Sequence, residues 1–397
     1  MKLAVMCKWP PFVGGETTKA YFMVKSLTKY FKIDVFSCGW ELKTHESCKI
    51  PYNEISELTF DGKINLFSSS FFQRPNFIPE YNPLSEKISS LFIESNENEK
   101  YDVILAWYLL PFGVAAYISS KTTKVPYIVQ HAGSDISRIF SGTRILQPLL
   151  IEVFRNAKFV FSYPGVLQLF RDVLRIENIV VAHHHYLLDP KLFRVDKKDA
   201  ISYIEKYLTP EQMDKLYKWN EENRLIILKP GKLSRYKGIK EFLDILSKKE
   251  DLSGIIVGAG KMREFVIKRE KTSDNLIYVD AVPPWSMPYF YSISNIVLHL
   301  EINFPVKNHR SLIPLDAQLS GKPVISNTQS FIINDSLYFK ISNSERNLIE
   351  SVLEKISKIK TISLDEKRHE KIIENFAKSH DIYVTNIKKV IEASAFE

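Results

Sequence analysis

Cysteine, glycine and long apolar runs are scarce in this chain of 397 residues, which has three cysteines and 14 glycines. Cys7, Cys38 and Cys48 form no Cys-x-x-Cys pair, so the sequence offers neither a disulfide framework nor a thiolate metal site. Residues 1–10 contain no apolar signal region, and no window approaches ~18 uninterrupted apolar residues. We therefore expect a cytoplasmic protein without a spanning helix, which could lie peripherally on the cytosolic face of a membrane.

Motifs for several common partners are also missing. The sequence has no RNP-type motif, zinc-finger spacing or Arg-rich tract, so nucleic acid is not expected as a partner. It has no Gly-Lys-Ser/Thr at the spacing that a Walker A loop requires, no complete dinucleotide fingerprint and no evident Asp-x-Asp metal motif. His183 and His185 alternate along one strand, but a third ligand is not evident nearby, and we predict no metal site. The net charge of +8 favours anionic partners such as nucleotides.

What the sequence does have is a repeated alternation of strand and helix. Its length suits two domains of about 150 to 200 residues each. Such alternation predicts two α/β domains in tandem, each a doubly wound, mainly parallel sheet, with a ligand cleft between them. The predicted strands are 2–6, 33–37, 64–68, 102–107, 127–130, 159–162 and 179–182 in the first half, and 225–230, 254–257, 276–279, 296–300 and 324–326 in the second.

The pattern also predicts where the domains begin and end. Residues 1–195 form the N-terminal domain, 196–223 a helical connection, and 224–378 the C-terminal domain. Residues 379–397 are expected to form a C-terminal helix that packs back toward the N-terminal domain. Three charged helices are predicted over 345–358, 364–378 and 382–393.

The segment 225–240 is the strongest candidate for a binding site. It reads as a buried strand that ends at Gly231, a loop with Lys232, Arg235 and Lys237, and a helix that begins near Ile239. Cations therefore gather beside a helix N-terminus, at the strand end where ligands of open α/β sheets bind. The loop is a candidate cradle for a phosphate or diphosphate. A solvated lysine-rich turn is the alternative that this loop alone leaves open.

Other strand ends carry weaker signals. Gly14 and Gly15 follow two prolines and let the backbone pass close to a ligand, although a tight turn without a ligand fits equally. His131 and Asp135 follow the strand at 127–130, where a histidine is more often structural than catalytic. Phe71 and Phe72 belong to a proline-broken aromatic stretch that is either core or an exposed patch for a lipid or partner.

Four motifs in order resemble those of one enzyme family. They are the glycine loop at 10–15, the His-Ala-Gly-Ser-Asp segment at 131–135, the Gly-Lys-Leu…Lys-Gly segment at 231–238, and Pro-Leu-Asp-Ala…Gly-Lys-Pro-Val-Ile at 314–325. Together they resemble the family 4 retaining glycosyltransferases over nearly the whole chain. The resemblance implies the GT-B fold, made of two Rossmann-like domains, with an acceptor-side N-terminal domain and a nucleotide-sugar-binding C-terminal domain.

The resemblance also implies an activity and the residues that support it. The protein would move a sugar from a UDP- or GDP-linked donor to a glycan, glycolipid or protein-linked acceptor, with retention of configuration and without a cofactor. Lys232 and Lys237 would neutralise the departing diphosphate without a metal ion. Gly14 and Gly15 would lie close to the donor phosphates and the acceptor, and Gly231 would lie close to the phosphates. Asp316 would bind the ribose, and Asn308 and His131 would bind the donor sugar. Asp135, Phe71 and Phe72 would lie on the acceptor side.

The chain departs from the family pattern at the donor site. Asn308 and Asp316 stand where the family has two glutamates, and Lys232 stands where arginine is usual. Asn308 keeps hydrogen-bonding capacity without charge, and a lysine replaces the bidentate fork of an arginine. Two alternatives follow. One is a weakly active or inactive protein that binds nucleotide sugars, and the other is a different nucleotide-using enzyme, such as an epimerase or a pyridoxal-phosphate phosphorylase.

Overall fold

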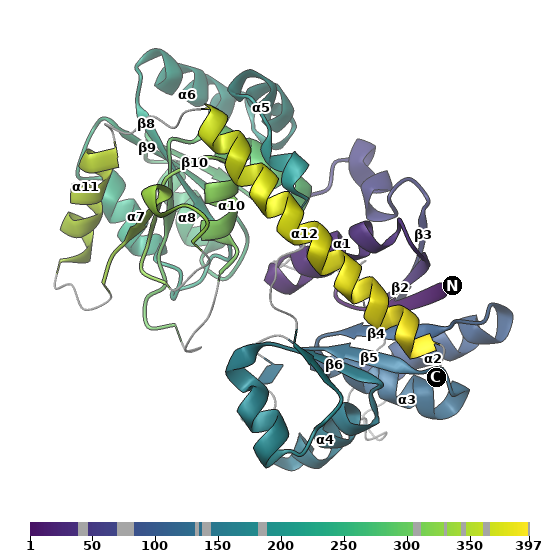
Figure 1. Cartoon of the computed structure of the whole chain (residues 1–397). Helices are drawn as coiled ribbons and strands as arrows, with labels where there is room; N and C mark the ends of the chain where they lie inside the picture. The colour runs from purple at the N-terminus through teal and green to yellow at the C-terminus, as the bar shows by residue number, and fades with distance from the viewer. Residues whose placement is uncertain are drawn as a thin grey trace, which may run out of the picture.

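The computed structural model describes residues 1–38, 47–69, 83–131, 135–136, 144–181, 189–304, 311–328, 332–342, 347–359 and 366–395. It shows two α/β domains, each built on one parallel sheet, with a long helix that runs across both (Figure 1). The predicted fold class is therefore confirmed. Phe71, Phe72, His183, His185 and Asn308 lie outside the described residues.

The N-terminal domain contains a seven-stranded sheet in the order β3-β2-β1-β4-β5-β6-β7. All its described pairings are parallel, and β1 and β4 are apolar runs buried on both faces, as a covered parallel sheet requires. Two apolar clusters fill the two sides of the sheet. The strands are β1 (Lys2–Met6), β2 (Lys32–Cys38), β3 (Ile64–Ser69), β4 (Val103–Trp107), β5 (Tyr127–Gln130), β6 (Phe159–Ser162) and β7 (Ile179–Val181).

The C-terminal domain contains a six-stranded parallel sheet in the order β10-β9-β8-β11-β12-β13. The order places β8 in the middle, between β9 and β11, and so brings the loops that follow these three strands to one edge. The strands are β8 (Leu225–Pro230), β9 (Leu252–Val257), β10 (Leu276–Val279), β11 (Ile296–His299), β12 (Val324–Ser326) and β13 (Tyr338–Lys340).

Helices cover both sheets. The connection between the domains is helical, and its α6 begins with a capping box in which Thr209 and Gln212 each bond the other's backbone. The helices are α1 (Gly15–Leu27), α2 (Pro83–Asn98), α3 (Val114–Thr123), α4 (Gln147–Asn156), α5 (Lys197–Ile204), α6 (Pro210–Glu221), α7 (Ile239–Leu246), α8 (Arg263–Glu270), α9 (Met287–Ile293), α10 (Ile313–Leu319), α11 (Leu348–Ile359) and α12 (Glu366–Ala395).

The last helix differs from the sequence prediction. Two helices were expected over 364–378 and 382–393, but α12 runs without a break for 30 residues. The residues between the expected helices include neither proline nor glycine, and His380 in that stretch lies 3.3 Å from the hydroxyl of Ser26 in α1. Packing against a neighbouring helix thus continues through the expected break. β13 was also missed, because three residues show no periodicity.

Contacts of α12 extend to both domains. His369, near its start, lies 2.7 Å from the carbonyl oxygen of Leu319 in α10. Further along, Gln130 of β5 donates to the hydroxyl of Tyr383 at 3.3 Å, and Val384 joins the apolar cluster of the N-terminal domain. The helix therefore ties the two domains together along its length (Figure 1).

Candidate active site at the domain interface

The loop between β8 and α7 (231–238) lies at the carboxyl edge of the C-terminal sheet, where glycines make room for it. A Cβ atom on Gly258 would come 2.0 Å from the carbonyl oxygen of Gly231, and one on Gly260 would come 2.4 Å from that of Leu233. The turn after β9 therefore packs backbone to backbone against this loop. The sequence showed Gly258 and Gly260 only as an incomplete fingerprint, and their structural role comes from the neighbouring strand.

The other side of the loop is equally close-packed. Gly238 has a left-handed backbone with φ of 63°, and a Cβ atom there would come 2.5 Å from Cβ of Leu300, just after β11. Gly231 has φ of 111°, and its Cβ would come 3.0 Å from the side chain of Ile313 in α10. The loop is thus fixed between the ends of β9 and β11 and the start of α10.

The glycine loop of the N-terminal domain faces this region. Gly14 precedes α1 with φ of 144°, and a Cβ atom on Gly15 would lie 3.9 Å from the side chain of Leu312. Leu312 immediately precedes α10, which carries Asp316, in the C-terminal domain. The structure therefore places the predicted residues Gly14, Gly15 and Gly231 around the start of α10, across the interface between the domains.

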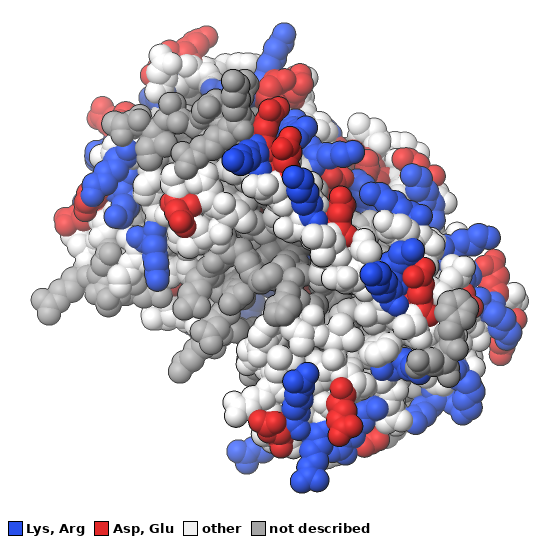
Figure 2. Space-filling model, in the orientation of Figure 1, with Lys and Arg blue, Asp and Glu red and all other residues white. Residues whose placement is uncertain are grey.

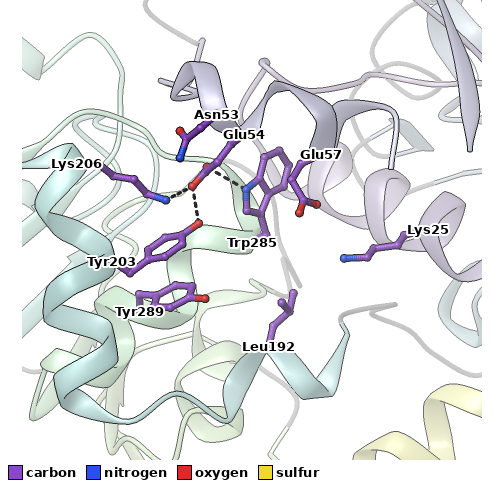
Figure 3. A pocket seen from close by; sticks show the side chains of 9 residues that line it. All are labelled: Lys25, Asn53, Glu54, Glu57, Leu192, Tyr203, Lys206, Trp285 and Tyr289. Atoms are coloured by element: carbon purple, nitrogen blue, oxygen red, sulfur yellow. Dashed lines mark hydrogen bonds and ion pairs between the residues drawn. The ribbon is translucent and has the colours of Figure 1, made fainter. Parts of the chain in front are cut away.

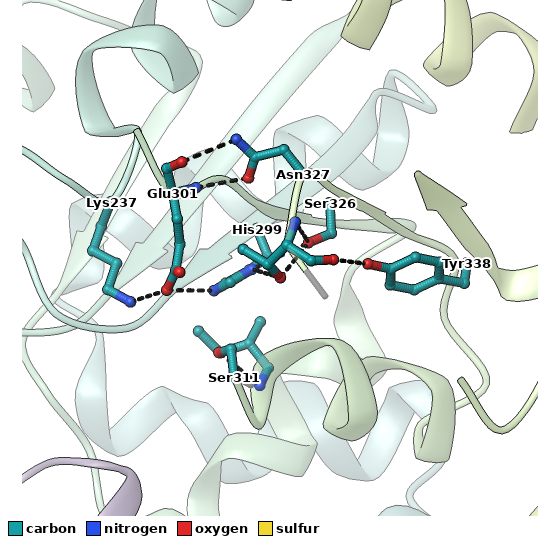
Figure 4. Close-up of polar contacts among 9 residues, drawn as sticks. Lys237, His299, Glu301, Ser311, Ser326, Asn327 and Tyr338 are labelled. Atoms are coloured by element: carbon teal, nitrogen blue, oxygen red, sulfur yellow. Dashed lines mark hydrogen bonds and ion pairs between the residues drawn. The ribbon is translucent and has the colours of Figure 1, made fainter. Parts of the chain in front are cut away.

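Lys237 does not stand alone in the loop. Its ammonium pairs with the carboxylate of Glu301, which follows β11 (Figure 4). The ammonium also lies 4.3 Å from the ring centroid of Phe304. The side chains of Lys237 and Glu301 are 15% and 6% exposed, so this ion pair is well shielded from water. Lys232 is exposed. Sequence reasoning missed Glu301, although an acidic residue directly after a buried strand was a signal.

Glu301 belongs to a polar network over the ends of β11 and β12 (Figure 4). Its backbone N–H donates to Asn327 Oδ1 at 2.8 Å, and Asn327 Nδ2 donates to the Glu301 carbonyl oxygen at 3.0 Å. The buried His299 lies with Nε2 3.8 Å from the Glu301 carboxylate and Nδ1 3.3 Å from the hydroxyls of both Ser326 and Thr328. Asn327 thus fixes the Glu301 backbone at the strand end from which the carboxylate reaches Lys237.

Asp316 lies in α10 with little around it to satisfy a charge. The hydroxyl of Tyr291 is 3.5 Å from Oδ2, while Oδ1 is buried without a hydrogen-bond partner among the described residues. Burial raises the pKa of Asp316 well above its ordinary value, although the Tyr291 hydroxyl opposes the shift. A carboxyl group with one unsatisfied oxygen can bind a hydroxyl group of a ligand, and a ribose offers two.

His131 and Asp135 are both buried in the N-terminal domain. His131 Nε2 lies 2.9 Å from the hydroxyl of Ser162, and its ring packs 5.1 Å from the ring of Phe170. Asp135 accepts a hydrogen bond from the backbone N–H of Leu109 at 3.0 Å, and both side chains are 0% exposed. The residues around them would have to move before either side chain touched a sugar, so these two roles stay predictions.

A second contact between the domains centres on Glu54, in the short 3-10 helix η1 (Tyr52–Leu58) (Figure 3). Its carboxylate accepts from Tyr203 at 2.7 Å and Tyr207 at 2.9 Å, and pairs with Lys206. Trp285 also donates to it, at 3.2 Å. Burial favours a higher pKa, but these donors outweigh it and hold the Glu54 pKa below its ordinary value. A cavity of about 290 Å³ adjoins the cluster.

Two further features bear on function. Among the described residues, no three His, Cys, Asp or Glu side chains gather as they would around a metal ion. In the same part of the chain, no helix combines the length and apolar character needed to cross a membrane. Figure 2 shows basic and acidic side chains interspersed over the visible face, so the net charge of +8 does not form a single basic patch there.

Sequence comparison finds a family match in the C-terminal part of the chain. Residues 214–379 match the family described as glycosyl transferases group 1. The matched range begins within α6, spans the six-stranded sheet and ends within α12, so it includes Lys232, Lys237, Glu301 and Asp316. No curated protein matches the chain at the sequence level.

Solved structures share the fold over the whole chain. Anabaena Alr3699/HepE in complex with UDP and glucose has a TM-score of 0.64 and 14% identity, over 99% of this chain and 100% of that one. A glycosyltransferase from Rickettsia africae ESF-5 has a TM-score of 0.61 and 16% identity, over 100% of this chain and 99% of that one. UDP-GlcNAc 2-epimerase from Neisseria meningitidis bound to UDP-GlcNAc has a TM-score of 0.54 and 16% identity, over 95% of this chain and 100% of that one. At these identities the likeness shows the fold alone, which hosts more than one reaction.

Proposed function

We propose, from a group 1 glycosyl transferase domain at residues 214–379 in a chain with the GT-B fold, that this protein transfers a sugar from a nucleotide-sugar donor to a hydroxylated acceptor. One observation carries the proposal. The lysine loop, the unsatisfied carboxyl of Asp316 and the glycine loop of the other domain converge on the start of α10. These are the groups that a diphosphate, a ribose and a close backbone approach require.

In this proposal each part of the donor has a partner. Lys237 and the exposed Lys232 bind the diphosphate, and Asp316 binds the ribose through its unsatisfied oxygen. Gly14 and Gly15 let the N-terminal domain approach the phosphates and the acceptor. A UDP-linked donor is the first to test, because HepE was solved with UDP and glucose and the epimerase with UDP-GlcNAc. Asn308 and His131 remain proposed contacts of the donor sugar.

The chemistry asks the protein to stabilise one developing charge. When the bond between sugar and diphosphate breaks, negative charge grows on the departing phosphate, and fixed cations lower the energy of that state. We propose that Lys237 and Lys232 do this without a metal ion. Retention of configuration, and a glycan, glycolipid or protein-linked acceptor, belong to the same proposal. Residues of either domain next to the glycine loop would receive the acceptor.

The first test is binding of UDP, GDP, ADP and their common sugar conjugates, followed by thermal unfolding. A ligand at 100 times its Kd adds about 2.7 kcal/mol to stability, which gives a clear rise in Tm. We expect one nucleotide family to raise Tm, and incubation of its sugar conjugate with glycan acceptors to release the free nucleotide. If no nucleotide raises Tm, the proposed function is wrong.

One alternative has a specific observation in its favour. Glu301 pairs with Lys237, so a ligand must compete with an internal carboxylate for the cation. A protein that binds a nucleotide sugar but turns it over slowly, or not at all, would show such a site. Binding without release of nucleotide from any donor, across a panel of acceptors, would favour this second function.

A further inference from the structure

Lys229 is a buried lysine that the proposed function leaves unexplained. It lies on β8, is 1% exposed, and belongs with Trp9 and Phe242 among the largest fully buried side chains. No hydrogen bond or ion pair links its ammonium to another described residue, and its nitrogen is not among the fully enclosed polar atoms that lack a partner, so the amine tip keeps slight contact with solvent. Burying an amine is costly, and apolar residues normally occupy such positions in a strand.

Its position connects it with the proposed diphosphate site. Side chains alternate along a strand, so Lys229 shares its face of the sheet with Ile227, which packs in the apolar cluster under α7. Two residues later the chain reaches Gly231 and the loop with Lys232 and Lys237. Lys229 is therefore buried on the strand that leads into this loop, whereas Lys232 and Lys237 lie in the loop itself.

The charges that act on Lys229 come from three elements. Together these influences lower the pKa of Lys229 from 10.5 to about 7, and burial is the largest of them. Lys237 in the loop acts in the same direction as burial, whereas Glu301 after β11 and Glu241 in α7 oppose the shift. An empty site at pH 8 thus holds a Lys237–Glu301 ion pair and a mostly uncharged Lys229. A diphosphate would add negative charge that this arrangement leaves unbalanced.

We propose that Lys229 is a proton-linked cation of the diphosphate site, which is neutral when the site is empty and takes up a proton from solvent when a nucleoside diphosphate binds. The proposal rests on the proposed function. When the phosphates bind Lys237, they neutralise its charge, so Lys237 repels Lys229 less. Glu301 can then interact with a second cation. The protonated Lys229 then balances charge from beneath the loop without contacting the sugar.

The sign of the pH dependence follows. Binding that takes up a proton weakens as pH rises above the pKa of the empty site, by up to about tenfold for each pH unit. The affinity for a nucleoside diphosphate should therefore fall between pH 7 and pH 9. A lysine that served only packing would give no such slope.

Isothermal titration calorimetry with UDP in two buffers of different ionisation enthalpy measures the protons taken up. At pH 8 we expect the wild-type protein to take up close to one proton per UDP, and Lys229→Met to take up almost none. The terminal phosphate of UDP has a pKa near 6, so it is already ionised at pH 8 and is common to both proteins. Lys240→Met, which removes an exposed lysine from α7, should behave as wild type.

Each result decides a different question. Equal proton uptake by wild type and Lys229→Met, with UDP bound to both, overturns the role of Lys229 and leaves the proposed function intact. If Lys229→Met does not fold, absence of proton uptake by the wild type at pH 8 overturns it instead. Failure of UDP and every other nucleotide to bind the wild type overturns the proposed function, and the role of Lys229 with it.

Discussion

At the scale of single residues, the properties of the candidate site depend on which charged side chains form ion pairs. Lys237 is held by Glu301, and Glu301 is held in turn by Asn327 and faces His299. The pair is shielded from water, so each partner strongly affects the other. Lys237 therefore has two roles to separate by mutation, one toward the ligand and one toward Glu301.

Lys237→Ala should lower kcat/KM by at least ~100-fold, because it removes a cation from the charge that develops on the leaving group. Steady-state kinetics with the donor identified by binding would measure the loss. The single variant also leaves Glu301 without its cation, so Lys237→Ala combined with Glu301→Gln should be as inactive but more stable. Arg235→Ala, in the same loop and exposed, serves as the control and should change the rate little. An unchanged rate in Lys237→Ala would remove its role.

Lys229→Met should stabilise the empty protein, by roughly 1–3 kcal/mol, because an apolar side chain of similar shape replaces an unpaired buried amine. The gain has a definite pH dependence. The folded pKa of Lys229 is depressed to about 7, so between pH 7 and 10.5 the unfolded chain holds a proton that the folded protein lacks. The advantage of the variant should be greatest at pH 7 and below, and should vanish above pH 10.5. Urea unfolding at pH 6.5 and pH 9.5 tests this, and an equal gain at both would contradict it.

At the scale of elements, loop positions depend on close backbone packing. The β8–α7 loop lies against the turn after β9 at the places where Gly258 and Gly260 lack side chains. Both glycines have positive φ, of 159° and 150°, a backbone conformation that residues with side chains rarely adopt. The nearby carbonyl oxygens of the neighbouring loop add a second requirement for glycine.

Gly258→Ala should destabilise the protein by about 2–4 kcal/mol and weaken nucleotide binding, because the new Cβ would lie 2.0 Å from a backbone oxygen that cannot rotate away. Gly62→Ala is a matched control. Gly62 also has a positive φ, of 82°, but nothing lies within 4 Å of its Cβ position, so only about 1 kcal/mol of backbone strain is expected. Urea unfolding compares the two variants. A loss at Gly258 no larger than that at Gly62 would show that the loop shifts easily.

At the scale of the whole molecule, the two domains are joined by α12 and by the cluster around Glu54. Trp285 of the C-terminal domain packs into the N-terminal core and stacks on Tyr21 with ring centroids 4.8 Å apart. The Glu54 carboxylate meanwhile receives its donors from Tyr203, Lys206 and Tyr207 of the connecting helices. These contacts fix how the glycine loop faces α10, and so complete the candidate site.

Glu54→Gln should cost about 2 kcal/mol, because charge-assisted hydrogen bonds to a carboxylate are replaced by neutral ones. The folded pKa of Glu54 is held below its ordinary 4.5, so the carboxylate's contribution is present above pH 4.5 and is lost as pH falls through the folded value. The stability difference between wild type and variant should therefore shrink in acid, as thermal unfolding at pH 7 and pH 3.5 would show. Glu57→Gln, which lines the same cavity and accepts from Tyr21, should cost less. A pH-independent difference would contradict the role of the Glu54 charge.

The sequence by itself determined the fold class and the centre of the candidate site. Strands buried on both faces must be continuous apolar runs, and glycines and lysines at their carboxyl ends mark ligand loops, so Gly14, Gly15, Gly231 and Lys237 could be found locally. Local patterns failed for α12, where packing against α1 carried a helix through a stretch that the sequence suggested as a break.

Only the tertiary structure decided which groups meet. Glu301 pairs with a lysine 64 residues away because β11 lies beside β8, an adjacency that strand order along the chain does not give. Glu54 meets Tyr203 across 149 residues because η1 of the N-terminal domain packs against the connecting helix α5. The sequence places Lys229 in the predicted strand 225–230 without assigning it a role, and only its burial among apolar neighbours makes it an amine that protonates at a cost. Charge pairing and burial arise from the three-dimensional arrangement, whereas strands and turns follow from neighbours in the chain.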